Sequence, residues 1–252
     1  MFVTIDQVRF NTQSFGAGAR NFVAHGGWTG SWELWRQPFE LLSRSWRCVS
    51  FDHRGCGETS APAGSITADR LVDDLFEVLD ALGVERCVLA GESMGSLIVL
   101  LAAERRPERF DGLVLVSAPP SIDARTTGAL VAGSRTDYPR TVAAFVRQCL
   151  PESDSEHLAR WGRHLLGRAE PEAAARLLEC LHGVQPKFES IQLPVLVIHG
   201  EQDAIVPLAA AQHVAASLPN ARLVVLPGVG HVPTVTTPER VAELVEDWAA
   251  TL

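Results

Sequence analysis

The chain has 252 residues, of which 46% are hydrophobic, enough to build one large domain or a domain that carries an insertion. Its net charge of −8 argues against a nucleic-acid-binding surface, because such a surface needs clustered lysine and arginine side chains. The amino-terminal sequence lacks the pattern of a signal peptide, and no apolar run approaches the ~20 residues of a membrane span, so we expect no membrane association.

In chain order, six short and nearly continuous apolar runs predict strands at residues 21–26, 47–52, 86–91, 112–117, 194–200 and 221–228. Strands that helices cover on both faces have this character. Cys48 and Cys87 lie inside two of these runs, and none of the five cysteines belongs to a C-x-x-C pair. These features favour buried, reduced thiols and a cytoplasmic location.

Helices are predicted between the strands. Residues 69–82 carry leucines at helical spacing. The last helix is predicted to begin with Thr237 as its side-chain cap and Pro238 at its first position. Strands that alternate with helices predict the α/β class, with a mostly parallel sheet that is flanked by helices and joined by right-handed crossovers.

One interval breaks this alternation. Between Pro119 and Leu193 no strand is predicted, and three helical segments can be recognised there, at about 136–150, 154–166 and 171–182. We therefore predict that residues 119–193 form a helical cap, or lid, inserted into a core of residues 1–118 and 194–252.

The stretch LAGESMGSLIV, residues 89–99, passes from a predicted strand to a predicted helix through a serine that stands between two glycines. Glycine and serine are common in ordinary turns, so a plain turn is one interpretation. In the G-x-S-x-G pattern, however, the serine is a nucleophile on a strained strand-to-helix turn, and its small neighbours let the strand and helix approach closely. The start of the helix near Met94 would favour developing negative charge at the same place. We predict that Ser93 is such a nucleophile.

A serine hydroxyl becomes a good nucleophile only when a base takes its proton and an acid orients that base. His231 follows the last predicted strand, and Asp203 follows the strand before it, so both belong to the sheet edge that carries Ser93. The order Ser, Asp, His along the chain is the order that nucleophile-elbow enzymes use. Each residue also has a structural interpretation. His231 could be a loop histidine without a catalytic role, and Asp203 could be a helix cap. Asp123 and Glu201 are competing candidates for the acid.

A tetrahedral intermediate also needs two fixed hydrogen-bond donors for its oxyanion. We predict the backbone N–H of Met94, which follows the nucleophile, and that of Gly27 in the glycine-rich turn HGGWTG, with Trp28 as a wall of the pocket. The alternative is a glycine loop that binds no ligand. Such a mechanism requires no metal or organic cofactor, and none is predicted; no histidine shows the spacing of a metal ligand.

Five motifs together resemble the α/β-hydrolase superfamily, namely HGGW (25–28), FDHRGCGETS (51–60), GESMG (91–95), HGEQD (199–203) and GVGHVP (229–234). The resemblance implies a sheet of up to eight strands and a substrate pocket between cap and core. It also implies that Asp52, Arg54, Gly55 and Gly57 shape a loop beside that pocket.

The predicted function is that of an enzyme, a serine hydrolase of the carboxylesterase or lactonase type, which cleaves a small to medium ester or lactone through an acyl-enzyme intermediate. Trp28, Phe145 and Trp161 predict a largely apolar pocket for this small-molecule substrate. The same triad could instead cleave a thioester or a C–C bond beside a carbonyl. A ligand-binding protein that carries a triad is the alternative from another class. The sequence predicts no oligomeric state.

Overall fold

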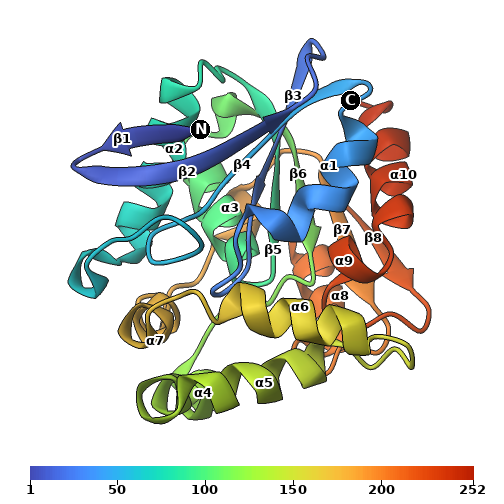
Figure 1. Ribbon diagram of the computed structural model, residues 1–252. Helices are drawn as coiled ribbons and strands as arrows, with labels where there is room; N and C mark the ends of the chain where they lie inside the picture. Colours follow the sequence, from blue (N-terminus) through green and yellow to red (C-terminus); the bar gives the residue numbers. More distant parts are fainter.

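The computed structural model describes residues 1–252, and its centre is one eight-stranded sheet with the strand order β1-β2-β4-β3-β5-β6-β7-β8. The strands β3 to β8 are parallel to one another, whereas β1 and β2 pair antiparallel. Helices flank this sheet (Figure 1). The predicted fold class is therefore confirmed, with a mostly parallel sheet of eight strands.

The six apolar runs of the sequence all form strands, close to their predicted bounds: β3 (Arg20–His25), β4 (Trp46–Phe51), β5 (Cys87–Glu92), β6 (Phe110–Val116), β7 (Val195–Gly200) and β8 (Ala221–Leu226). The structure adds β1 (Phe2–Ile5) and β2 (Val8–Phe15), a hairpin that turns through Asp6 and Gln7. In β1, exposed and half-buried residues alternate, as expected for a strand at the edge of a sheet. It therefore has no continuous apolar run.

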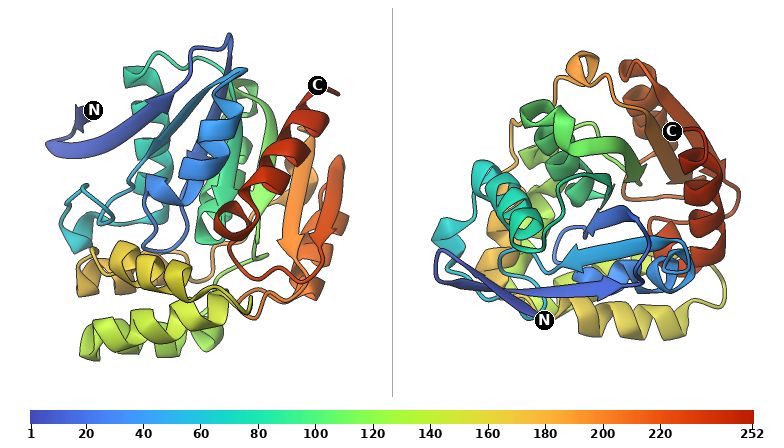
Figure 2. Two further views of the ribbon diagram at one scale, coloured as in Figure 1. Left: turned by 45° about the vertical axis from the view of Figure 1, so that its right-hand side comes forward. Right: turned by 90° about the horizontal axis from the view of Figure 1, so that it is seen from above.

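Helices cover both faces of the sheet (Figure 2), with α1 packed against α10 and α2 packed against α3. Outside residues 119–193 the helices are α1 (Arg36–Leu42), α2 (Ala68–Ala81), α3 (Met94–Arg105), α8 (Leu208–Ser217), α9 (Pro233–Thr236) and α10 (Pro238–Ala249), with short 3₁₀ helices at Trp32–Trp35, Ala63–Ser65 and Pro107–Arg109; a further 3₁₀ helix, Phe188–Ser190, directly precedes β7. The last helix begins at Pro238 as predicted. The predicted cap is wrong in its chemistry, because the Thr237 hydroxyl donates to the carbonyl of Pro233 and caps no amide. No helix combines the length and the apolar character that a bilayer crossing requires.

Residues 119–193 lie between β6 and β7 and contribute no strand to the sheet. They form four helices, which Figure 1 shows gathered on one side of the molecule: α4 (Ala124–Thr136), α5 (Tyr138–Cys149), α6 (Glu156–Leu166) and α7 (Pro171–Glu179). Three of them match the predicted segments. The fourth, α4, consists largely of small and polar residues and has no strong apolar stripe. Its first turn is fixed by Asp123, whose carboxylate accepts hydrogen bonds from the N–H groups of Arg125 and Thr126.

The loop after β4 is held by two buried carboxylates. Asp52 accepts hydrogen bonds from the Asn11 side chain and from two backbone N–H groups. Gly57 has a φ of +53°, and a Cβ added there would lie 2.2 Å from Oδ2 of Asp52, so only glycine fits. Arg54 forms a buried ion pair with Asp74 at 2.6 Å. This part of the chain therefore serves to shape the loop.

Candidate active site

Ser93 lies between the last residue of β5, Glu92, and the first residue of α3, Met94. Its backbone has φ of 52° and ψ of −122°. This backbone conformation is rarely populated by residues with a side chain and is typical of a strained functional position. A Cβ added at Gly91 would lie 2.7 Å from the carbonyl oxygen of Gly95, and one added at Gly95 would lie 2.4 Å from the carbonyl oxygen of Gly26. The two flanking glycines therefore allow the close approach of strand, helix and the turn after β3.

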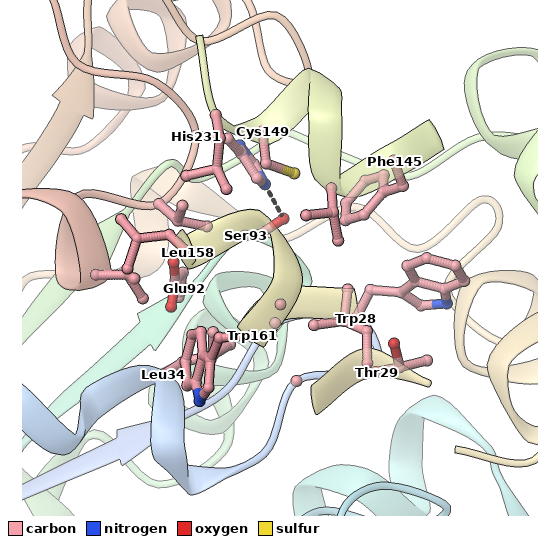
Figure 3. Close-up of a pocket in the computed structure, with 18 residues that line it drawn as sticks. Trp28, Thr29, Leu34, Glu92, Ser93, Phe145, Cys149, Leu158, Trp161 and His231 are labelled. Carbon is pink, nitrogen blue, oxygen red and sulfur yellow. Dashed lines mark hydrogen bonds between the residues drawn. The ribbon is translucent and has the colours of Figure 1, made fainter. Parts of the chain in front are cut away.

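Three side chains from three strand ends form a continuous chain of hydrogen bonds. Nε2 of His231 lies 3.0 Å from Oγ of Ser93, a contact that Figure 3 shows as a dashed line. Nδ1 of His231 lies 2.8 Å from Oδ2 of Asp203. With the ring proton on Nδ1, the imidazole donates to the carboxylate and accepts from the serine hydroxyl. Asp203 and His231 are buried, whereas Ser93 is partly exposed and reachable from outside.

The carboxylate of Asp203 is stabilised in its ionised form. Burial opposes ionisation, but the hydrogen bonds from His231 and from the Val206 N–H lower the pKa of Asp203 below its usual value. Its second oxygen, Oδ1, accepts from the N–H groups of Ile205 and Val206, each at 2.9 Å. The carboxylate is therefore fixed in position and charged beside the imidazole.

The two competing acids occupy other places. Glu201 accepts a hydrogen bond from the N–H of Gly228 at 3.1 Å and is exposed. Asp123 caps α4. Neither is hydrogen-bonded to His231, so among the three candidates only Asp203 is placed to orient that ring.

Other histidines are buried in structural contacts. His199 lies with Nε2 2.9 Å from the carbonyl oxygen of Val206. The rings of His25 and His53 stack with their centroids 4.7 Å apart, and burial lowers the pKa of His25 to about 4.

No group of three or more His, Cys, Asp and Glu side chains is arranged to hold a metal ion.

Both predicted oxyanion donors lie beside the serine. A Cβ added at Gly27 would lie 3.4 Å from Cβ of Ser93, and the Gly27 N–H has no hydrogen-bond partner in the chain. Met94 is the first residue of α3, where amides have no intrahelical acceptor. Gly27 and Met94 therefore both lie next to Ser93, each with a backbone N–H that no acceptor of the chain occupies.

Ser93 opens onto two hollows. The narrow hollow, with a free volume of about 60 Å³, lies between the strand ends, α5 and α6 (Figure 3). The broad hollow, with about 660 Å³, follows α4 and α5. Of the predicted pocket residues, Trp28 and Phe145 line both hollows, and Trp161 lines the narrow one. The ring of Phe145 lies 5.1 Å from that of Trp28 and 6.3 Å from that of His231.

Comparison with known proteins shows to which family the chain belongs. A family model described as the alpha/beta hydrolase fold matches residues 21–174 and 150–238. The chain belongs to the α/β-hydrolase family. This confirms the resemblance that its motifs carry.

Relatives of this hydrolase are named for several related reactions. It is 31% identical over 232 residues to the pimeloyl-(acyl-carrier protein) methyl ester esterase of Nitrosomonas europaea, a match that covers 85% of this chain and 89% of the relative. It is 28% identical over 229 residues to the “Putative carbamate hydrolase RutD” of Caulobacter sp., covering 86% and 85%. The enol-lactonase from Burkholderia xenovorans superposes with a TM-score of 0.92 at 22% identity, over 99% and 100% of the two chains, and this likeness shows the fold.

Sequence reasoning missed one titratable residue of this hydrolase, Glu92, which directly precedes the nucleophile. Its side chain is buried, its Oε1 accepts a hydrogen bond from the Thr234 hydroxyl at 3.1 Å, and its Oε2 has no partner. Burial raises the pKa of Glu92 to about 8, and the nearby charge of Asp203 acts in the same direction. The available signal was a charged residue at the end of an otherwise apolar strand.

This burial predicts how stability depends on pH. Folding favours the protonated carboxyl, so the stability that Glu92 contributes is present below its ordinary pKa of 4.5 and is lost as pH rises through about 8. Glu92→Gln keeps an acceptor for Thr234 and cannot ionise. We expect this variant to exceed the wild type at about pH 7.5 by on the order of 4 kcal/mol in unfolding free energy, because that pH lies three units above 4.5 and each unit corresponds to about 1.4 kcal/mol, and to match it near pH 4.

Urea denaturation of both proteins at the two pH values measures this difference. The exposed Glu189 offers a control, since Glu189→Gln should leave the pH dependence as in the wild type. An equal difference between Glu92→Gln and the wild type at both pH values would contradict the prediction.

Proposed function

We propose that this hydrolase cleaves a small to medium carboxylic ester or lactone through an acyl-enzyme on Ser93, with His231 as the base and Asp203 as the orienting acid. The observation that carries the proposal is the hydrogen-bond chain from Asp203 through His231 to the serine hydroxyl, beside two backbone N–H groups. The names of relatives, a methyl ester esterase and a lactonase, agree with this reaction type.

In the first half-reaction, Oγ of Ser93 attacks the carbonyl carbon while Nε2 of His231 takes its proton. Asp203 stabilises the imidazolium that forms. The N–H groups of Gly27 and Met94 bind the oxyanion, and each such donor lowers the barrier by about 3 kcal/mol. His231 then gives its proton to the leaving oxygen, the C–O bond breaks and the acyl group stays on Ser93.

In the second half-reaction, water takes the place of the alcohol. His231 removes a proton from the water, the hydroxide attacks the acyl carbon, and the same two N–H groups bind the new oxyanion. Collapse of this intermediate breaks the bond to Ser93, whose oxygen regains the proton from His231. The products are the carboxylic acid and the free enzyme.

We also propose that residues 119–193 act as a cap over a core of residues 1–118 and 194–252. Phe145 of α5 and Trp161 of α6 line the hollow at Ser93, so the helices of this insertion contribute walls of the site. A wall of this kind keeps bulk water from the reacting carbonyl and strengthens the electrostatic interactions around it.

A carbamate is the second candidate substrate, since relatives carry the name of carbamate hydrolases. The same residues would attack a carbonyl that bears a nitrogen atom. A panel of short esters, lactones, a carbamate, a thioester and a vinylogous diketone, with chromatography of the products, separates these reactions. We expect esters or lactones to be turned over fastest and a fluorophosphonate to label Ser93 in a one-to-one ratio. Absence of labelling would favour a binding protein.

A further inference from the structure

The groups around Ser93 determine on which side of the serine each part of a bound ester lies. The carbonyl carbon of the tetrahedral intermediate carries four substituents, of which one is Oγ of Ser93 and one is the oxyanion at Gly27 and Met94. The third, the leaving oxygen, has to come within hydrogen-bond reach of Nε2 of His231, which protonates it. The fourth is the acyl chain.

His231 lines the narrow hollow and does not line the broad one. The part of the substrate that follows the leaving oxygen therefore enters the narrow hollow. Met94 shows the opposite pattern and lines only the broad hollow. The remaining substituent, the acyl chain, is directed along α4 and α5.

The two hollows differ in size and chemistry. Apart from the residues at the reaction centre, the narrow hollow is walled mainly by aliphatic and aromatic side chains, among them Leu34, Leu158 and Trp161 (Figure 3). Its free volume of about 60 Å³ is roughly a tenth of the 660 Å³ of the broad hollow, so only a small group fits there. This is the size of a short alkyl chain.

The broad hollow combines apolar side chains with hydrogen-bonding groups. It is lined by Leu130, Leu178 and Ile205, and also by polar and charged side chains at Ser121, Thr126, Thr127, Thr136, Asp137, Arg140, Thr141 and Gln148. Its volume of about 660 Å³ admits a chain of many atoms. Such a surface suits an amphipathic group, with alkyl segments and polar atoms along its length.

We infer that the substrate is an open-chain ester between a short apolar alcohol, held in the narrow hollow, and a larger amphipathic acid, held in the broad hollow. This inference rests on the proposed function and specifies its substrate. A small lactone fits it less well, because one small ring cannot extend into both hollows. Phe145 lines both hollows and packs against Trp28 and His231, so its ring separates the two parts of the ester.

Two isomeric esters test the direction of binding. Methyl 6-acetamidohexanoate has the short alcohol and the long amphipathic acid, and 5-acetamidopentyl acetate has the same atoms with the ester reversed. Both have ordinary alkyl leaving groups, so they differ mainly in which hollow each end has to enter. We expect kcat/KM, followed by chromatography of the products, to favour the methyl ester by at least about tenfold. A preference for the acetate would overturn the inference.

A pair of leucines provides matched variants, since both are partly buried and each lines one of the two hollows. Leu158 lines the narrow hollow and Leu130 the broad one. In the wild type we expect the hexyl ester of 6-acetamidohexanoic acid to react at least about tenfold more slowly than the methyl ester. Leu158→Ala should reduce this ratio about fivefold or more, and Leu130→Ala should leave it unchanged.

The outcomes separate this inference from the proposed function. Relief of the hexyl ester by Leu130→Ala and not by Leu158→Ala overturns the assignment of the hollows, although the enzyme remains an esterase. Hydrolysis of other esters, but of neither isomer, does the same. Failure to hydrolyse any ester, with no fluorophosphonate label on Ser93, overturns the proposed function and this inference with it.

Discussion

Ser93→Ala is expected to lower kcat for ester hydrolysis by on the order of 10⁴- to 10⁶-fold, because it removes the hydroxyl oxygen that we propose as the nucleophile. The substitution keeps the Cβ, so the backbone at φ of 52° and the packing of β5 against α3 should persist. The N–H groups of Gly27 and Met94 also remain, and residual catalysis above that in water is expected from them. Steady-state kinetics with a methyl ester, together with a thermal unfolding curve, measure both effects.

Ser117 offers a matched control in the same protein. It follows β6, the strand next to β5, has a φ of 50° and is buried, so it shares the strained backbone of Ser93 without being hydrogen-bonded to His231. Ser117→Ala should therefore retain activity within about twofold, as expected away from the reaction centre. More than a tenth of wild-type activity in Ser93→Ala would show that another group is the nucleophile.

The sequence predicted the strands that are continuous apolar runs and missed the two that are not. The strands β3 to β7 are visible because helices on both sides require such runs. The strand β8 lies at the edge of the sheet and is only partly buried, but it is also largely apolar and was therefore predicted. The edge strand β1 lacks such a run. The helix α4 was missed because its small and polar residues show little periodicity, and because Asp123, which caps it, was considered as a competing catalytic acid rather than as a helix cap.

For the candidate site, chain order and sheet topology were enough to bring three residues together. Parallel strands place their carboxyl ends on one edge, so Ser93, Asp203 and His231 could be grouped before any distance was known. Glu92 could not be assigned in the same way, because its role depends on burial and on the Thr234 hydroxyl, which comes from α9. The division into two hollows depends on the directions of the side chains on α4, α5 and α6, which helical periodicity does not give.

Asp203→Asn is expected to lower kcat by about 10⁴-fold while leaving the fold intact. The amide oxygen can still accept the hydrogen bonds from the N–H groups of Ile205 and Val206 that Oδ1 accepts in the wild type. The amide nitrogen then faces Nδ1 of His231 and donates to it. This places the ring proton on Nε2, so the imidazole can no longer accept the proton of the Ser93 hydroxyl.

Glu201→Gln is the matched control for this substitution, because it makes the same chemical change in an acid two residues away. Glu201 is exposed and hydrogen-bonded to the N–H of Gly228, a contact that a glutamine oxygen can also make. We expect Glu201→Gln to retain wild-type kcat, and fluorophosphonate labelling of Ser93 to slow in Asp203→Asn alone. If both variants lost activity equally, the effect would come from the loop after β7, and the orienting role of Asp203 would be wrong. If Asp203→Asn kept its activity, His231 would need no carboxylate to hold its proton on Nδ1, and the 2.8 Å contact would have no catalytic consequence.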